Sequence, residues 1–172
     1  MKNLRTARVL VAAFVGTAAL TACSGATEPA LALGEPVAVE VGETSMEFAV
    51  DDVREGTVED LQEMGAAATG LEGRGVYFVT YSVTLVSGDI ADADSAELPV
   101  PTAEEWELDG PGTYEPLTVI GQIDCTPDGN ATNGVGPDAP LVGCQAFVGA
   151  ADSLPETIAV TDLGEWSVPT GS

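Results

Sequence analysis

The feature that most constrains this chain of 172 residues is a long alternation of side chains that begins after Gly75. Apolar side chains occupy every second position, at Tyr77, Val79, Tyr81, Val83 and Leu85. The positions between them carry Phe78, Thr80, Ser82 and Thr84. Because successive side chains of a β-strand point to opposite faces, this run predicts a long strand with one face in a core. Its length and its β-branched and aromatic residues predict a central place in a sheet.

Shorter alternating runs lie on both sides of this strand. Residues 37–41 and 46–50 alternate around a Gly42-Glu43 turn and predict a hairpin. Further strands are expected at residues 106–108, 117–124, 142–148, 157–161 and 165–168, which clusters of Gly, Pro and Asp separate. About eight short strands with little helix predict a mainly β fold, an antiparallel two-sheet β-sandwich.

One short helix is expected between the hairpin and the long strand. Thr57 and Asp60 approximate a capping box, in which each residue bonds the backbone N–H of the other. The helix is expected over residues 58–64, and Gly65 offers a stop. Because two turns of helix are marginal on their own, we expect this segment to cross one end of the sandwich.

The N-terminal segment has the layout of an export signal. Lys2, Arg5 and Arg8 precede an apolar run over residues 9–20, which is shorter than the ~20 residues that a membrane-spanning helix needs. The sequence Leu20-Thr21-Ala22-Cys23 then resembles the lipobox of bacterial lipoproteins at all four positions. The resemblance implies cleavage before Cys23 and acyl chains of the palmitate type on that residue. The alternative is an ordinary secretory signal with a chance cysteine at its cleavage site.

This interpretation divides the chain into three parts. Residues 1–22 are the signal peptide, residues 23–36 form the lipidated N-terminus and a tether of small residues and prolines, and residues 37–172 form one domain. The expected location is the cell membrane, with the domain on the extracytoplasmic side. Two or more acyl chains anchor a protein stably, because each buried methylene contributes about 0.8 kcal/mol.

The remaining cysteines fit an oxidising compartment. Assigning Cys23 to lipid leaves Cys125 and Cys144, and we expect them to form a disulfide. The alternatives are a two-cysteine metal site or two free thiols. The chain has no His, so zinc lacks its usual ligand set, and we expect no metal and no other cofactor.

The charge excludes or disfavours several functions. After residue 22 the chain has 28 acidic residues against two arginines, Arg54 and Arg74, which gives a net charge of −26. Nucleic-acid binding is disfavoured because neutralising phosphates takes clustered Lys and Arg. Without His, and with Lys only in the signal, a serine has no conventional base. Paired carboxylates could hydrolyse glycosides, but among so many acids a close pair discriminates nothing, and we do not expect an enzyme.

Four groups of residues are candidate binding features. One oxygen-rich stretch suits calcium, although its spacing is not that of an EF-hand, and we favour a solvated loop. Two tryptophans could stack on sugars, but their places in alternating strands favour core packing. A third group is expected on the wet face of an edge strand, and an Asn-Ala-Thr sequon is interpreted as a turn. The candidate calcium ligands are Asp89, Asp92, Asp94 and Glu97, and the two tryptophans are Trp106 and Trp166. The acids of the edge strand are Glu104, Glu105, Glu107 and Asp109, and the sequon begins at Asn130.

Three stretches in sequence order resemble an immunoglobulin-like domain family. Residues 42–50 resemble its opening hairpin, residues 75–85 its long central strand, and residues 108–116 the turn and tyrosine that follow. The family is common in lipoproteins of Gram-positive bacteria, including actinobacteria, and is related in fold to secreted mycobacterial immunoprotective antigens. The resemblance implies an immunoglobulin-like sandwich at the cell surface without catalytic residues. The acidic insertion at residues 89–97 and the long loop after Cys125 depart from the family pattern.

The sequence therefore predicts a lipid-anchored, non-enzymatic binding module. The expected partner is an envelope or extracellular protein or a glycan. The first alternative is a cation-responsive adhesion or envelope-assembly module that uses the acidic loops. The second is a carboxylate-dependent hydrolase of envelope glycans. A concave cleft with two inward carboxylates favours the hydrolase, whereas acidic side chains that face water favour the module.

The net charge predicts that salt stabilises the fold. Compact packing concentrates a repulsion that the expanded chain relieves. Raising the sodium chloride concentration from about 0.01 M to about 0.15 M shortens the screening length from about 30 Å to about 8 Å. We therefore expect the melting temperature to rise over this range, as measured by circular dichroism. A melting temperature that does not change with the sodium chloride concentration would contradict the repulsion argument.

Overall fold

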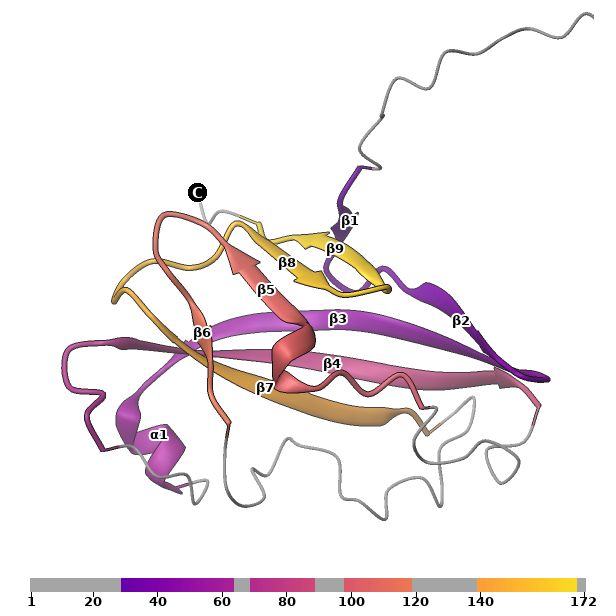
Figure 1. Ribbon diagram of the computed structural model, residues 1–172, viewed down its shortest axis with the longest axis horizontal. Helices are drawn as coiled ribbons and strands as arrows, with labels where there is room; N and C mark the ends of the chain where they lie inside the picture. The colour runs from indigo at the N-terminus through magenta and orange to yellow at the C-terminus, as the bar shows by residue number, and fades with distance from the viewer. Residues whose placement is uncertain (1–28, 64–68, 89–97, 119–138, 170–172) are drawn as a thin grey trace, which may run out of the picture.

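The computed structural model describes residues 29–63, 69–88, 98–118 and 139–169. Over these residues the chain forms two β-sheets packed against each other, with one short α-helix (Figure 1). The elements in chain order are β1 (Leu31–Ala32), β2 (Val37–Val41), β3 (Thr44–Gly56), α1 (Val58–Glu63), β4 (Gly75–Ser87), the short 3-10 helix η2 (Ala103–Glu105), β5 (Trp106–Asp109), β6 (Glu115–Pro116), β7 (Leu141–Gly149), β8 (Thr157–Val160) and β9 (Gly164–Ser167). The predicted mainly β, two-sheet sandwich is confirmed.

The larger sheet is built around the long strand that the sequence predicts. Its order is β2-β3-β4-β7-β6, so β4 lies in the centre, and all its neighbouring strands are antiparallel. The β2–β3 hairpin turns at Gly42, whose φ of 61° lies in the left-handed region that glycine enters without steric cost. Strands β3 and β4 are 13 residues each, which makes both longer than the alternating runs predict.

The smaller sheet has the order β1-β9-β8-β5. Strands β5, β8 and β9 form where short strands are expected, and β7 does so in the larger sheet. Strand β6 lies just before the strand expected at residues 117–124, and its ladder with β7 is extended by a bond from the Leu117 N–H to the Ala146 carbonyl at 2.8 Å. Residues 119–124 lie outside the described part.

The main core lies between the two sheets and is rich in aromatic rings. The ring centroid of Phe48 is 5.5 Å from that of Tyr81, 6.4 Å from that of Trp106 and 5.7 Å from that of Trp166. Phe48 and Tyr81 come from the larger sheet, whereas the two tryptophans come from the smaller one. These contacts tie the sheets together at the middle of the sandwich.

A second apolar cluster covers part of the outer face of the larger sheet. Leu61 of α1 is fully buried against Val76 and Phe78 of β4 and Ala146 of β7. The capping box is confirmed: the Thr57 N–H donates to the Asp60 carboxylate at 2.7 Å, and the Asp60 N–H donates to the Thr57 hydroxyl at 3.1 Å. The bond from the Thr57 N–H, and after it the Thr57 side chain, lower the pKa of the Asp60 carboxyl, which suits an acid at a helix N-terminus.

The N-terminal boundary of the fold differs from the prediction. Strand β1 pairs in parallel with β9, and the Gly34 N–H donates to the Val50 carbonyl at 2.8 Å. The indole N–H of Trp166 donates to the Glu35 carbonyl at 2.9 Å. Residues 31–36, which the sequence assigns to the tether, are therefore part of the fold. A strand of two residues is too short to show a period in the sequence.

Two tyrosines hold the connection between β7 and β8. The Tyr77 hydroxyl donates to the Ala150 carbonyl and accepts a bond from the Ser153 N–H at 3.2 Å. The Tyr114 hydroxyl donates to the Ser153 carbonyl at 2.7 Å. A Cβ atom at Gly149 would lie 2.6 Å from the Tyr114 ring, so only glycine fits there. These contacts fix the end of the sandwich that carries α1.

Burial of Tyr81 predicts a loss of stability at high pH. Burial raises the pKa of the Tyr81 phenol to about 12, whereas an unfolded tyrosine titrates near 10. The fold favours the protonated phenol, so this stabilisation is complete below about pH 10 and is lost as the pH rises towards 12. We expect the free energy of unfolding to fall by about 2 kcal/mol over this interval. Urea denaturation at constant ionic strength measures it.

The variant Tyr81→Phe should remove most of this pH dependence. The only lysine of the chain is Lys2, so no ammonium group of the folded domain titrates in the same interval. Burial also raises the pKa of Tyr114, which makes Tyr114→Phe the matched control with a smaller effect. An unchanged slope in Tyr81→Phe would show that another group causes the loss.

The Trp166 contact predicts that the first strand depends on one indole N–H. Trp166→Phe keeps an aromatic ring in the core but leaves the Glu35 carbonyl without its donor. We expect a loss of about 1–2 kcal/mol from the free energy of unfolding and faster protease cleavage within residues 29–36. Limited proteolysis followed by mass spectrometry locates the cleavage.

Trp106→Phe is the matched control for this experiment. The Trp106 indole N–H is buried and has no hydrogen-bond partner within the described residues. Removing it therefore relieves an unsatisfied donor instead of breaking a bond. We expect a smaller loss of stability and no new cleavage near β1. Equal cleavage in both variants would contradict a specific role for the Trp166–Glu35 bond.

Candidate functional site

The two sheets differ in length, and this difference creates the candidate site. At about 3.3 Å per residue, the 13 residues of β3 and β4 span about 43 Å, whereas the four residues of β8 and β9 span about 13 Å. Figure 1 shows the larger sheet extending past the β8–β9 turn towards the β2–β3 turn. Apolar side chains at this end are therefore only partly buried. They include Val37, Val39, Val41, Leu85 and Leu163.

Two pockets lie on either side of the β8–β9 turn. The larger has a volume of about 720 Å³ and is lined by Leu31 of β1, Val37 of β2 and Ala159 of β8, among others. The smaller has a volume of about 190 Å³ and is lined by Leu98 and Val100. Val160, Asp162 and Leu163 line both pockets. Ligand sites commonly measure about 300–1,000 Å³, so the larger pocket is the candidate binding site.

Local backbone contacts fix the turn between the pockets. The Leu163 N–H donates to the Val160 carbonyl at 3.1 Å, and the Thr161 N–H donates to the Glu105 carbonyl at 2.9 Å. Asp162 has a φ of 62°, a left-handed conformation that Asp and Asn adopt more readily than most residues. The sequence at the turn thus sets its shape and places a carboxylate at its tip.

Carboxylates surround the apolar lining of both pockets. Asp162 and Glu165 line the larger pocket, and Glu105 lines the smaller one. All three residues are exposed. The Glu105 carboxylate accepts bonds from the Thr102 N–H at 2.6 Å and the Thr102 hydroxyl at 2.8 Å. These bonds lower the pKa of Glu105, so its charge persists into moderately acidic conditions.

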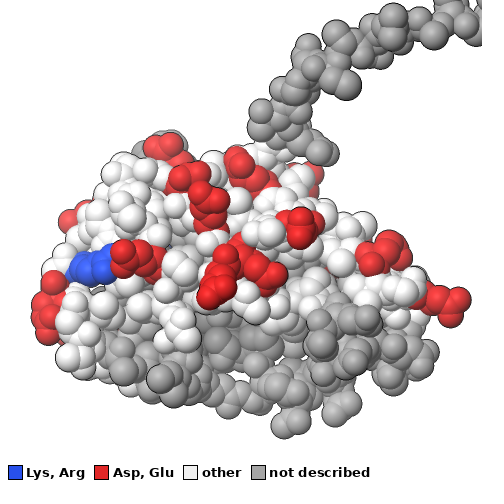
Figure 2. All heavy atoms as spheres, viewed as in Figure 1, with Lys and Arg blue, Asp and Glu red and all other residues white. Residues whose placement is uncertain are grey.

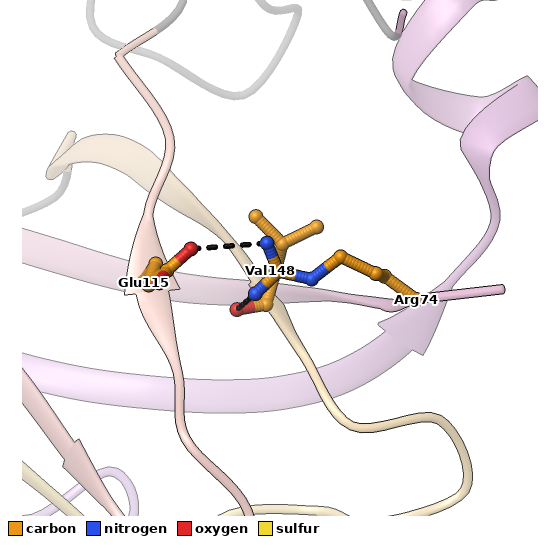
Figure 3. Close-up of polar contacts among 3 residues, drawn as sticks. All are labelled: Arg74, Glu115 and Val148. Carbon is orange, nitrogen blue, oxygen red and sulfur yellow. Dashed lines mark hydrogen bonds and ion pairs between the residues drawn. The ribbon is translucent and has the colours of Figure 1, made fainter. Parts of the chain in front are cut away.

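Both arginines of the domain lie at the opposite end, where α1 packs. The Arg54 guanidinium is 4.4 Å from the centre of the Phe78 ring. Arg74 forms an ion pair with Glu115 at 3.0 Å and donates to the Val148 carbonyl at 3.4 Å (Figure 3). Figure 2 shows acidic side chains spread over this face and a single basic patch near the α1 end. The pockets therefore combine an apolar lining with uncompensated negative charge.

The lining of the larger pocket offers apolar side chains and two carboxylates. The larger pocket is lined by no Ser, Cys, His or Lys that could act as a nucleophile or a conventional base. Its two carboxylates, Asp162 and Glu165, belong to exposed residues. In the described ranges, no group of three or more His, Cys, Asp or Glu is placed to hold a metal ion.

The residues predicted to be buried or exposed are placed as expected. Trp106 is 5% exposed and Trp166 is 0% exposed, so neither can stack on a sugar at the surface. Glu104, Glu105, Glu107 and Asp109 are exposed in and before β5, which is an edge strand of the smaller sheet. The core-packing and wet-edge interpretations are confirmed.

The other predicted sites lie wholly or partly outside the described residues. Cys144 lies in β7, on the outer face of the larger sheet, and is 3% exposed. Its expected partner Cys125 and the expected lipid site Cys23 are not among the described residues, so both assignments stay predictions. The same holds for Asp89, Asp92, Asp94 and Glu97, and for the sequon at residues 130–132.

The pocket itself was missed in the sequence. Its lining comes from two regions that are far apart in the chain, residues 29–37 and 159–165, and neither of them carries a motif. The available signal was the difference between an 11-residue strand pattern at residues 75–85 and the much shorter patterns near the C-terminus. Such a difference means that one sheet cannot cover the other.

The described part of the chain contains no helix long and apolar enough to cross a bilayer. Comparison of the chain with known protein families, curated proteins and solved structures found no match. The two-sheet sandwich is thus established by the structure alone.

Proposed function

We propose that this chain is an exported bacterial lipoprotein that displays its β-sandwich as a non-enzymatic binding module on the extracytoplasmic side of the cell membrane. The observation that carries the proposal is the position of Cys23, which ends a lipobox-like sequence and lies eight residues before Leu31 of β1. Eight residues reach about 28 Å at most. A lipid on Cys23 would therefore keep β1, and the larger pocket beside it, close to the membrane surface.

The pocket supports a binding role. Its volume of about 720 Å³ and its apolar lining are typical of sites that recognise a ligand. The partner we propose is an envelope or extracellular protein or a glycan, and the net charge of −26 opposes nucleic acid. The immunoglobulin-like resemblance of residues 42–50, 75–85 and 108–116 agrees with such a role, since this class of sandwich commonly serves as a surface domain.

We also propose the Cys125–Cys144 disulfide as part of this exported domain. The chain that leaves β6 runs beside β7, because the Leu117 carbonyl accepts a bond from the Gln145 side chain at 3.0 Å and the Leu117 N–H bonds to Ala146. Cys125 follows Leu117 by eight residues. A bridge to Cys144 would restrict the unfolded chain by about 3 kcal/mol in the loop-entropy model.

Lipidation is tested by expressing the full chain in a bacterium with an intact lipoprotein pathway. We expect the mature wild type to begin at Cys23, to carry the mass of its acyl chains in intact-mass spectrometry, and to partition into detergent. Cys23→Ala should lose both the acyl mass and the partitioning. Cys144→Ala is the matched control, because it removes a cysteine without touching the lipobox.

An unacylated mature N-terminus would overturn the anchor proposal. The same spectra test the disulfide, since the bonded wild type should be lighter than the reduced form by the mass of two hydrogen atoms. Two thiols that react with an alkylating reagent in the native exported protein would contradict the bridge.

A further inference from the structure

The geometry points to a basic polypeptide segment as the partner of the larger pocket, with an apolar side chain of that segment inserted among Leu31, Val37, Ala159 and Leu163. Lysine or arginine residues on either side of this apolar anchor would pair with Asp162 and Glu165. The inference rests on the proposed role as a binding module and names the chemistry of the partner. It concerns the larger of the two pockets beside the β8–β9 turn.

The lining supplies the apolar half of this recognition. Leu31, Val37 and Leu163 pack against the main core and are only partly buried. Ala159 is also partly buried and is the smallest side chain of the four, which leaves room above it for a guest. Binding energy at protein interfaces concentrates where such a pocket takes a single anchoring side chain. An aliphatic side chain therefore fits this position.

The rim supplies the ionic half. Asp162 and Glu165 are three positions apart across the turn, and both are exposed beside the pocket. The arginines are too distant to neutralise them. Val37 pairs with Phe48, and Arg54 lies six residues further along β3, which corresponds to about 20 Å. Arg74 precedes β4 at the same distant end and is paired with Glu115.

Charge complementarity decides between the candidate partners. A domain with a net charge of −26 attracts basic segments over long range and raises their association rate. The same charge repels a second copy of the chain and any fatty-acid anion. The pocket has no aromatic residue in its lining on which a sugar could stack, and both tryptophans of the domain are buried, which disfavours a glycan.

The experiment uses the mature lipidated protein in nanodiscs of phosphatidylcholine, a lipid without net charge. The probe is a short fluorescein-labelled peptide with two leucines between two pairs of lysines, and fluorescence anisotropy measures its binding. We expect saturable binding at one site that weakens as ionic strength rises. Peptides with Ser in place of Leu, or Glu in place of Lys, should not bind.

Three protein variants localise the site. Asp162→Asn/Glu165→Gln should weaken binding roughly fivefold, as expected for the loss of two exposed ion pairs, and Asn keeps the left-handed conformation of the turn. Glu63→Gln/Glu72→Gln is the matched control, because it removes two exposed carboxylates from the region of α1. Ala159→Trp should fill the pocket and abolish binding. Circular dichroism checks that each variant folds. If Ala159→Trp does not fold, the charge variants alone decide whether the pocket binds the peptide.

Several results would overturn the inference. Equal weakening by both carboxylate pairs would mean that the peptide responds only to net charge. Equal binding of the Ser peptide would mean that the apolar lining is not used. Binding by unlipidated protein but not by lipidated protein would assign the pocket to an acyl chain. Dimerisation that Ala159→Trp abolishes, without peptide competition, would assign it to a second copy.

Failure of the anchor proposal is distinguishable from failure of this inference. If Cys23 carries no lipid, the mature chain is titrated in buffer with the same peptides and variants. A positive result there keeps the pocket assignment and rejects only the anchor. Absence of peptide binding by an acylated, folded wild type rejects the pocket assignment and leaves the anchor in place.

Discussion

The contact between Phe48 and the two tryptophans is the interaction on which the rest of the sandwich depends. Phe48 lies in β3 of the larger sheet, and its ring meets both Trp106 and Trp166 from the smaller sheet. Aromatic rings bury about 150–250 Å² each, so this cluster supplies much of the apolar area that holds the layers together. The smaller sheet packs over this cluster. Its four-residue strands do not reach the ends of the larger sheet, where only loops lie opposite it.

This arrangement explains why the two ends of the molecule differ. At the α1 end, Tyr77 and Tyr114 bond to the β7–β8 connection and close the sandwich. At the other end no comparable clamp is present within the described residues, and Val39, Val41 and Leu85 stay partly exposed. The pockets beside the β8–β9 turn follow from this asymmetry. They arise from a mismatch of strand lengths, so the site is a consequence of the architecture and needs no special motif.

Side-chain periodicity predicted the elements that alternate over at least four residues, and local chemistry predicted the helix. The run from Tyr77 to Leu85 gave the central strand, and Thr57 with Asp60 gave the start of α1. Periodicity could not predict β1, because two residues carry no period and the parallel pairing with β9 joins distant parts of the chain. The strand predicted at residues 117–124 lies mostly outside the described residues, and β6 at Glu115–Pro116, directly before it, is likewise too short to show a period.

The candidate site was harder to predict than the fold, for a physical reason. In the sequence, Leu31 belongs to the predicted tether, Val37 to a predicted strand and Leu163 to a predicted turn. Only the tertiary structure brings these three residues together. By contrast, buried Trp106 and Trp166 were predictable, because an apolar position in an alternating strand reports burial directly. A pocket made of the parts that a sheet fails to cover leaves no pattern in any one segment. It becomes visible only when the lengths of the two sheets are compared.

The first strand links the proposed anchor to the pocket. Leu31 pairs with Trp166, lines the larger pocket and lies eight residues from Cys23. Because Trp166 also bonds to the Glu35 carbonyl, β1 and the segment after it are fixed to β9 on both sides of the Gly34 turn. A lipid on Cys23 would thus be joined to one wall of the pocket by only eight residues. The pocket would then face partners that lie at the membrane surface, where basic segments would meet a strongly negative protein on their approach.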